Sequence, residues 1–219
     1  MKKIIFLIVS FLWVPAVIHA QQDTFRPELA IGPSFGVNYT TVLFMPKVDT
    51  KMKQGFTGGV TFRLKTEKNL GLQAEINYSQ EGWEETFDDP RYSFSRTLSY
   101  IEVPFMTHIH FGGKRSRFFI NLGPMVGFYW GGNSKSQLEG YETNRPTEQH
   151  SMDVQNKIQW GLGGGPGYEL HTGIGSFILE VRYYYLLGDI YKTRKEDVFS
   201  QASGQVFSAK IAYLIPFLK

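Results

Sequence analysis

Apolar side chains recur at every second position in eight separate segments of the chain, with small or polar residues between them. Successive side chains of a β-strand point to opposite faces, so this period of two predicts strands with one apolar face. None of the positions on the apolar faces is charged. The segments are residues 29–39, 56–64, 70–78, 101–111, 118–130, 158–170, 177–187 and 207–217.

The opposite faces of these segments carry small, polar and a few charged residues, such as Gly36, Asn38, Gln73 and Glu75. Such side chains suit the interior of a narrow barrel, because eight strands leave room only for side chains. Each segment also reaches the roughly 9–11 residues with which a tilted strand crosses a bilayer. We therefore predict an all-β fold, an eight-stranded antiparallel up-and-down transmembrane β-barrel whose apolar faces meet lipid.

The connections between the predicted strands alternate in length. Outer-membrane barrels have short periplasmic turns and longer extracellular loops, so this alternation places both chain ends at the periplasmic rim. The short connections are residues 65–69, 112–116 and 172–176, and the long ones are 43–54, 80–97, 131–157 and 188–204.

Aromatic residues lie at the ends of the predicted strands, where amphipathic rings suit the boundary between lipid and water. Trp83 follows the segment 70–78 out of phase with its apolar face, so we expect it in a loop. The predicted aromatic girdle consists of Tyr78, Trp130, Trp160 and Tyr185 beside the long loops, and of Phe111, Phe118 and Phe217 at the other rim.

Three glycine–proline pairs interrupt the pattern inside predicted strands, at Pro33, Pro124 and Pro166. Proline removes one hydrogen bond from a strand ladder. We expect β-bulges there, which would sharpen the curvature of the sheet.

The first residues have the features of a secretory signal peptide, with Lys2 and Lys3 before an apolar run over 4–17. We predict cleavage after Ala20, with Ala16 as the alternative site, so that 21–219 forms the barrel domain. The chain has no cysteine, which excludes a disulfide scaffold, a thiolate metal site, a cysteine nucleophile and a lipid-modified cysteine. Its net charge of +3 is scattered, and no basic face for nucleic acid is visible.

Six charged residues share the inward parity of their segments. Charges inside a barrel surrounded by lipid must pair or change their ionisation, so we predict a structural charge network that closes the lumen. A polar pore or a proton path is the alternative interpretation. The residues are Arg63, Glu75, Glu102, Glu180, Arg182 and Lys210.

Two histidines, His108 and His110, share a face with Glu102. Two imidazoles on one strand could bind a metal if a third ligand converged, and with Ser99 the same group could act as a hydrolase on membrane lipid. The acidic stretch 81–89 could hold calcium, although a solvated loop fits it better. We favour histidines that form hydrogen bonds at the rim, and we expect no catalytic residue, no metal site and no cofactor.

Several stretches resemble the outer-membrane β-barrel family usually called PorT-like, and Tyr-Ile-Glu-Val-Pro at 100–104 is the most distinctive. The resemblance implies an eight-stranded barrel in the outer membrane. The founding member of that family is linked to a secretion system, and the family supplies no catalytic motif. The other matching stretches are 71–79, 119–124, 161–169 and 179–183.

The sequence thus favours a non-enzymatic barrel of the cell outer membrane whose long loops contact external ligands or partners, or which assists a larger envelope assembly. The expected partners are outer-membrane lipid and, as candidates, envelope or secretion-system proteins, with a monomeric chain and no nucleic acid. A lipid-modifying barrel enzyme built around His108 and Glu102 is one alternative. A soluble periplasmic barrel of lipocalin type, holding an apolar ligand inside, is another.

Overall fold

The computed structural model of the chain describes residues 27–141, 147–194 and 196–218. The expected signal peptide, residues 1–20, lies outside the described residues. Within the described ranges, no helix is both long and apolar enough to cross a membrane.

Eight long strands and one very short strand make up the sheet. The described connections add a single turn of 3-10 helix, η2 (Glu148–His150). The long strands are β1 (Glu28–Met45), β3 (Lys53–Lys65), β4 (Leu70–Glu85), β5 (Ser93–Gly112), β6 (Ser116–Gln137), β7 (Ile158–His171), β8 (Ser176–Asp189) and β9 (Gln201–Leu218), and the short one is β2 (Thr50–Lys51).

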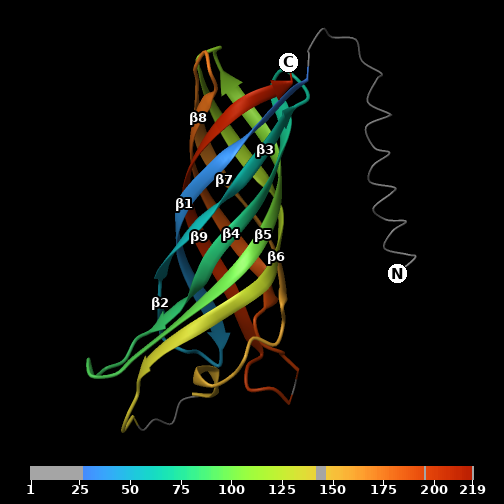
Figure 1. Cartoon of the computed structure of the whole chain (residues 1–219). Helices are drawn as coiled ribbons and strands as arrows, with labels where there is room; N and C mark the ends of the chain where they lie inside the picture. Colours follow the sequence, from blue (N-terminus) through green and yellow to red (C-terminus); the bar gives the residue numbers. More distant parts are fainter. Residues whose placement is uncertain (1–26, 142–146, 195, 219) are drawn as a thin grey trace.

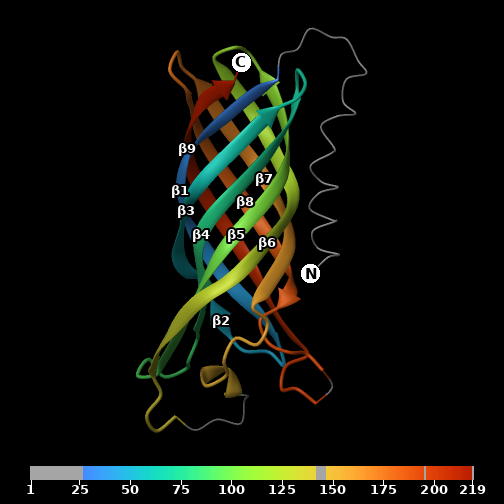
Figure 2. The same cartoon turned by 45° about the vertical axis from the view of Figure 1, so that its right-hand side comes forward.

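Every long strand pairs antiparallel with the long strands before and after it, and β1 pairs with β9 to close the ring (Figures 1 and 2). The two residues of β2 pair only with the end of β4. Lipid offers no partner for free backbone groups, and closure removes the edges where such groups would lie. The predicted eight-stranded, up-and-down antiparallel barrel is confirmed.

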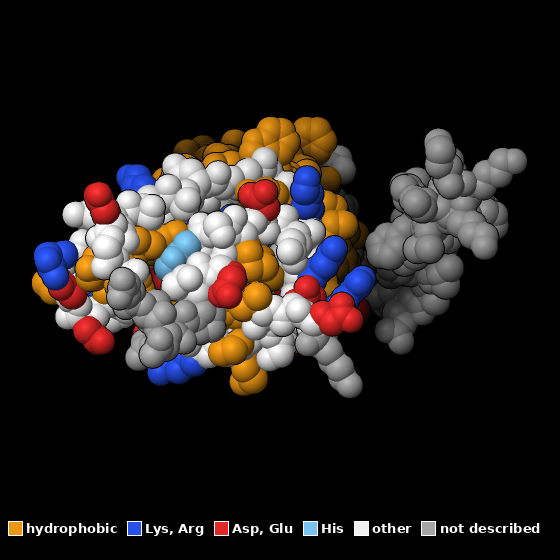
Figure 3. All heavy atoms as spheres, turned by 90° about the horizontal axis from the view of Figure 1, so that it is seen from below, with side chains coloured by type: hydrophobic (Ala, Val, Ile, Leu, Met, Phe, Trp, Pro, Cys, Tyr) orange, Lys and Arg blue, Asp and Glu red, His pale blue; other side chains and the backbone are white. Residues whose placement is uncertain are grey.

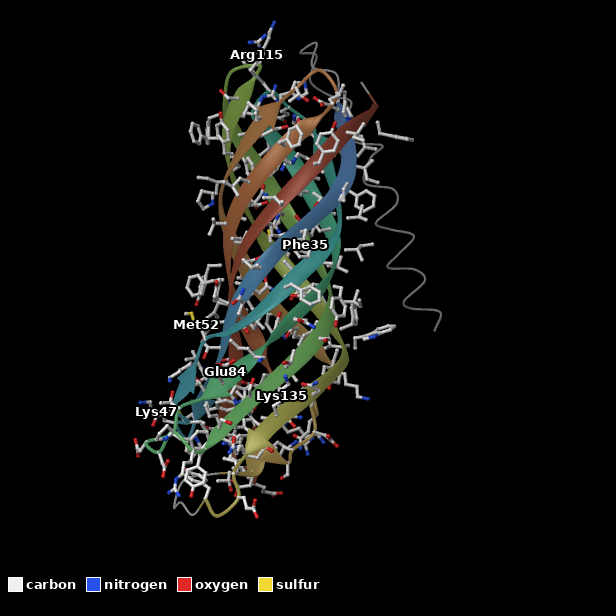
Figure 4. All side chains as sticks on the ribbon, turned by 60° about the vertical axis from the view of Figure 1, so that its left-hand side comes forward. Phe35, Lys47, Met52, Glu84, Arg115 and Lys135 are labelled. Atoms are coloured by element: carbon white, nitrogen blue, oxygen red, sulfur yellow. The ribbon has the colours of Figure 1, made fainter. Side chains whose placement is uncertain are left out.

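Side chains alternate between the lipid-facing surface and the lumen along each long strand. Phe35 is 56% exposed and projects outward at mid-height (Figure 4), whereas its neighbour Ser34 is 6% exposed. In all eight long strands, the apolar parity predicted from the sequence faces outward. The lipocalin-like alternative required apolar side chains on the inside and is therefore wrong.

The short turns all lie at one end of the barrel, where the described chain also begins and ends (Figure 1). The expected placement of both described ends at this rim is confirmed. The turns span residues 66–69, 113–115 and 172–175. Following the usual orientation of outer-membrane barrels, this is the periplasmic end.

The long connections are partly β-strand, which corrects the prediction. Strand β4 runs to Glu85, β5 begins at Ser93 and β6 extends to Gln137, so these three strands project beyond the rest of the barrel (Figure 1). The strand ends predicted from the sequence lie where the outward residues become polar, but backbone pairing between the strands continues past these positions. Trp83 was expected in a loop, yet it lies in β4 and is fully buried, because its parity points into the lumen.

The three glycine–proline pairs do not form bulges, and that prediction is wrong. The pairing register is continuous through Pro33, Pro124 and Pro166, and each proline lacks ladder pairs toward only one neighbouring strand. A Cβ atom on Gly32 or Gly165 would meet a backbone oxygen of that same neighbouring strand. Glycine therefore allows a close approach of two strands at the place where proline removes a hydrogen bond.

We predict that Leu122→Arg destabilises the barrel in lipid vesicles by about 2–4 kcal/mol, because it places a charge near the middle of the lipid-facing belt. Leu122 is 62% exposed on the outward face of β6. Ser116→Arg, on the same face at the periplasmic rim, should cost less than about 1 kcal/mol. Equilibrium unfolding in guanidinium measures both, and equal losses would contradict the placement of the belt.

Candidate functional site

A network of buried ions crosses the middle of the lumen. Glu75 on β4 accepts hydrogen bonds from Arg182 on β8 and Lys210 on β9, each at 2.5 Å. Arg182 also donates to both carboxylate oxygens of Glu180, at 2.5 and 2.7 Å. All four side chains are at most 5% exposed. Since β4 does not adjoin β8 or β9, these contacts connect opposite walls of the barrel.

Amides extend this network sideways. Asn121 donates to Glu180 at 2.6 Å, and its carbonyl oxygen lies 2.8 Å from Nδ1 of His108. Because the amide nitrogen of Asn121 is already a donor to Glu180, the His108 Nδ1–H donates to the amide oxygen. Asn77 donates to Glu75 at 2.8 Å. With these donors in place, both carboxylate oxygens of Glu75 and of Glu180 accept hydrogen bonds.

A second ionic group fills the lumen nearer the periplasmic end. Arg63 donates two hydrogen bonds to Gln73, at 2.8 and 2.7 Å, and its Nη1 lies 3.5 Å from a carboxylate oxygen of Glu169. Lys65 lies 3.5 Å from the other carboxylate oxygen of Glu169. The guanidinium of Arg63 also covers the ring of Phe119, 5.0 Å from its centroid. Glu169 was missed from the sequence, although it has the inward parity of its segment.

Glu102 also points into the lumen, but its contacts differ from those of the other five predicted network residues. Its carboxyl group is hydrogen-bonded to the carboxyl group of Glu81 and to the hydroxyl group of Ser79 rather than to a cation. Gln159 donates to Glu81 at 3.1 Å. A hydrogen bond between two carboxyl groups needs a proton on one of them. Glu81 and Glu102 form a third polar layer in the lumen, toward the long-loop end.

The two histidines lie inside the barrel, with rings stacked at 5.2 Å. His108 is fully buried and bonded to Asn121, so it is not a rim histidine, and its contacts do not include Glu102. Ser99 points outward and bonds to the hydroxyl of Tyr78 at 2.9 Å. The structure therefore does not bring together the residues of the hydrolase hypothesis.

The described residues contain no group of three or more histidine and carboxylate side chains that could hold a metal ion. The acidic stretch 81–89 is divided between different surroundings. Glu81 points into the lumen, Glu85 lies at the barrel mouth, and the exposed Asp89 pairs with Arg91 at 2.6 Å. Hydrogen bonds from Arg91 lower the pKa of Asp89 below its ordinary value.

An apolar cluster covers the ionic layers at the long-loop end. Its centre is Trp83, whose ring packs against Phe44 at 5.2 Å and Phe94 at 6.3 Å. Tyr191 and Phe199, from the connection between β8 and β9, complete it. Seen from this end, described side chains occupy the part of the barrel mouth that is in view (Figure 3).

A hydrogen-bonded clasp holds η2 across this mouth. Glu85 accepts hydrogen bonds from Trp83 at 3.3 Å and from Gln149 at 3.1 Å, and it lies 2.8 Å from Nε2 of His150. Arg96 donates to the hydroxyl of Tyr191 at 3.1 Å. Burial raises the pKa of Tyr191 to about 12, so this hydroxyl stays neutral and accepts the bond at physiological pH.

The lumen is therefore filled by polar layers and sealed by an apolar layer. A cavity beside Glu75 and Lys210 measures about 10 Å³, which is space for about one water molecule. This packing is what a narrow barrel of eight strands permits.

The predicted girdle residues lie on the outer surface. Six of them are exposed, from 37% for Tyr185 to 75% for Trp130. Tyr78 is half-buried by its bond to Ser99. Trp130 is the most exposed because β6 bulges there: Tyr100 pairs with Tyr129 while Ser99 pairs with Gly131, which leaves Trp130 as the extra residue.

An apolar exterior, a ring of antiparallel strands and a filled polar lumen define this chain as a small transmembrane β-barrel. It belongs to the family described as "Outer membrane protein beta-barrel domain", whose model matches residues 19–192. The chain is thus a protein of the outer membrane. No curated protein matches its sequence.

Solved outer-membrane barrels are similar to this chain at low identity. Ail, the attachment invasion locus protein of Yersinia pestis, is 13% identical, with 86% of this chain and 99% of Ail covered and a TM-score of 0.41. OprG from Pseudomonas aeruginosa is 10% identical, with 86% and 93% covered and a TM-score of 0.44. The outer membrane enzyme PagL is 13% identical, with 88% and 100% covered and a TM-score of 0.37.

We predict that Glu75→Gln lowers the free energy of unfolding by about 3–5 kcal/mol, because the buried cations Arg182 and Lys210 lose the counter-charge that they share. Glu84→Gln is the matched control on the same strand. That carboxylate is 46% exposed and 3.6 Å from Lys53, so its loss should cost less than about 1 kcal/mol. Equal effects on guanidinium unfolding would show that the network does not stabilise the barrel.

Proposed function

We propose that this protein is a non-enzymatic, non-conducting barrel that anchors a ligand- or partner-binding surface at the outside of the cell. One observation carries the proposal: ionic layers and an apolar cluster occupy the whole lumen. A barrel filled in this way has its outer surfaces, not its interior, available for function.

The tip of the projecting strands β4, β5 and β6 is the surface that this proposal assigns to external contacts. Half-buried aromatic rings gather at their tip, where Phe87 packs against Tyr141 at 5.1 Å and Tyr141 packs against Tyr92 at 4.9 Å. Tyrosines of this kind are frequent anchors in protein interfaces, because they offer a large apolar body with a polar end. The ring contacts and a 3.1 Å hydrogen bond from the Tyr92 hydroxyl to the carbonyl oxygen of Gly140 hold the tip in place, so binding would order few residues.

An accessory role in an envelope or secretion assembly is the form of this function that the PorT-like resemblance supports. In that role the chain would act as a monomer surrounded by outer-membrane lipid, with neither nucleic acid nor a cofactor among its partners. The partner would be a protein of the envelope that meets the projecting strands or the periplasmic turns.

We predict no steady conductance when the purified protein is inserted into planar lipid bilayers, because the buried ion pairs leave no continuous water path. Single-channel recording at both voltage polarities measures this. Reproducible current steps would contradict a closed lumen and would favour the pore alternative.

We also predict that His108→Ala leaves the lipid A of the expressing cells unchanged, because His108 is fully buried and meets neither Glu102 nor lipid. Mass spectrometry of lipid A from cells with the wild-type protein, the variant and no protein gives the comparison. A modification that depends on the wild-type protein and disappears in the variant would establish the lipid-modifying enzyme instead.

A further inference from the structure

The outward face of β5 changes its chemistry abruptly near the long-loop end. From the periplasmic side its outward residues are apolar up to Ile101 apart from Thr107, whereas the next four in the column, Ser99, Thr97, Ser95 and Ser93, all carry hydroxyl groups. Because the outward column is apolar only while it faces acyl chains, the step from Ile101 to Ser99 marks the outer edge of the hydrocarbon layer.

The bulge at Trp130 aligns polar residues of β6 with this hydroxyl column. The extra residue reverses the parity of β6, so that Gly131, Asn133 and Lys135 pair with Ser99, Thr97 and Ser95 on the same outward face. Without the bulge, these three residues would turn toward the inner side of the projecting sheet.

The aligned residues line a groove of about 390 Å³ on the outer face of the sheet. Lys135 is one of its lining residues and Trp130 lies at the membrane edge, while Lys53 contributes to the lining from β3. Lys53 is held there by a 2.6 Å hydrogen bond to Ser95 and an ion pair with Glu84 at 3.6 Å. Lys135 and Glu84 are labelled in Figure 4, on the projecting part of the sheet beyond Phe35.

The height of the groove determines which molecules meet it. A tilted strand climbs roughly 2.5 Å along the barrel axis per residue, so Ser95 lies about 15 Å beyond Ile101. The groove therefore begins at the edge of the hydrocarbon layer and extends through the level of the lipid headgroups. It also opens sideways, in the plane of the membrane, because it lies on the outward face of the barrel wall.

We propose that this groove binds the phosphorylated sugar headgroup of an outer-leaflet glycolipid. Hydroxyl and amide side chains match sugar hydroxyls, the lysines match phosphate, and the exposed indole of Trp130 offers an apolar face to a sugar ring. The occupant is a membrane lipid rather than a soluble ligand, because surrounding headgroups reach a sideways-facing groove at this height first. This site is separate from the tip to which we assign external partners.

The test uses the protein refolded in lipid-free detergent and titrated with rough lipopolysaccharide, with complexes counted by native mass spectrometry. Lys135→Gln should weaken binding about five- to tenfold, the loss of one charge-assisted hydrogen bond to phosphate. Lys157→Gln removes an exposed lysine just before β7, outside the groove, and should change binding less than about twofold. Equal losses in the two variants would overturn the proposal.

Two further experiments distinguish recognition of the phosphate from recognition of the sugar. With phosphate-stripped lipopolysaccharide, wild type and Lys135→Gln should bind alike, and a persisting difference would refute the assignment of Lys135 to phosphate. Thr97→Val should weaken lipopolysaccharide binding about threefold or more while leaving phosphatidylglycerol binding unchanged. Unchanged lipopolysaccharide binding, or an equal loss for phosphatidylglycerol, would refute sugar recognition. A boiling-dependent shift in gel mobility verifies that each variant is folded.

Discussion

The absence of water around the barrel wall is the constraint on which the whole structure depends. Backbone groups that face acyl chains have no solvent partner, so every strand must pair on both sides and the sheet must close between β1 and β9. Closure at eight strands then sets a lumen too narrow to remain open, and side chains must fill it. Proline is tolerated at Pro33 because the missing ladder pairs affect one neighbour only.

The same constraint explains the chemistry of the lumen. A carboxylate such as Glu75 is stable inside because Arg182 and Lys210 reach it from the opposite wall, and Asn77 satisfies a remaining lone pair. The polar layers give way to Trp83 and its aromatic neighbours where the strands leave the membrane. There the polarity of the sheet reverses, since water now lies outside and an apolar interior is favourable.

Particular residues show how far periodicity could predict this arrangement. Alternation located the outward faces correctly, because lipid contact imposes one repeated requirement on every strand. Alternation did not predict the position of Trp83 or the ends of the strands. Beyond the membrane the outward face meets water and becomes polar, while strand pairing continues. Alternation also missed Glu169, a lone inward carboxylate whose partner Arg63 lies 106 residues away in sequence. The bulge at Trp130 was invisible, since one extra residue alters pairing but not local composition.

The sequence by itself determined the fold class, the strand count, the membrane-facing surface and the candidate residues of the lumen, because these follow from local alternation and from the length of the turns. Only the tertiary structure decided which charges pair, that Glu102 meets Glu81 rather than a cation, and which polar residues gather in the outer groove. Those contacts join strands that are distant in the chain, and their geometry depends on the closed ring and on the register shift at Trp130, neither of which has a local signature.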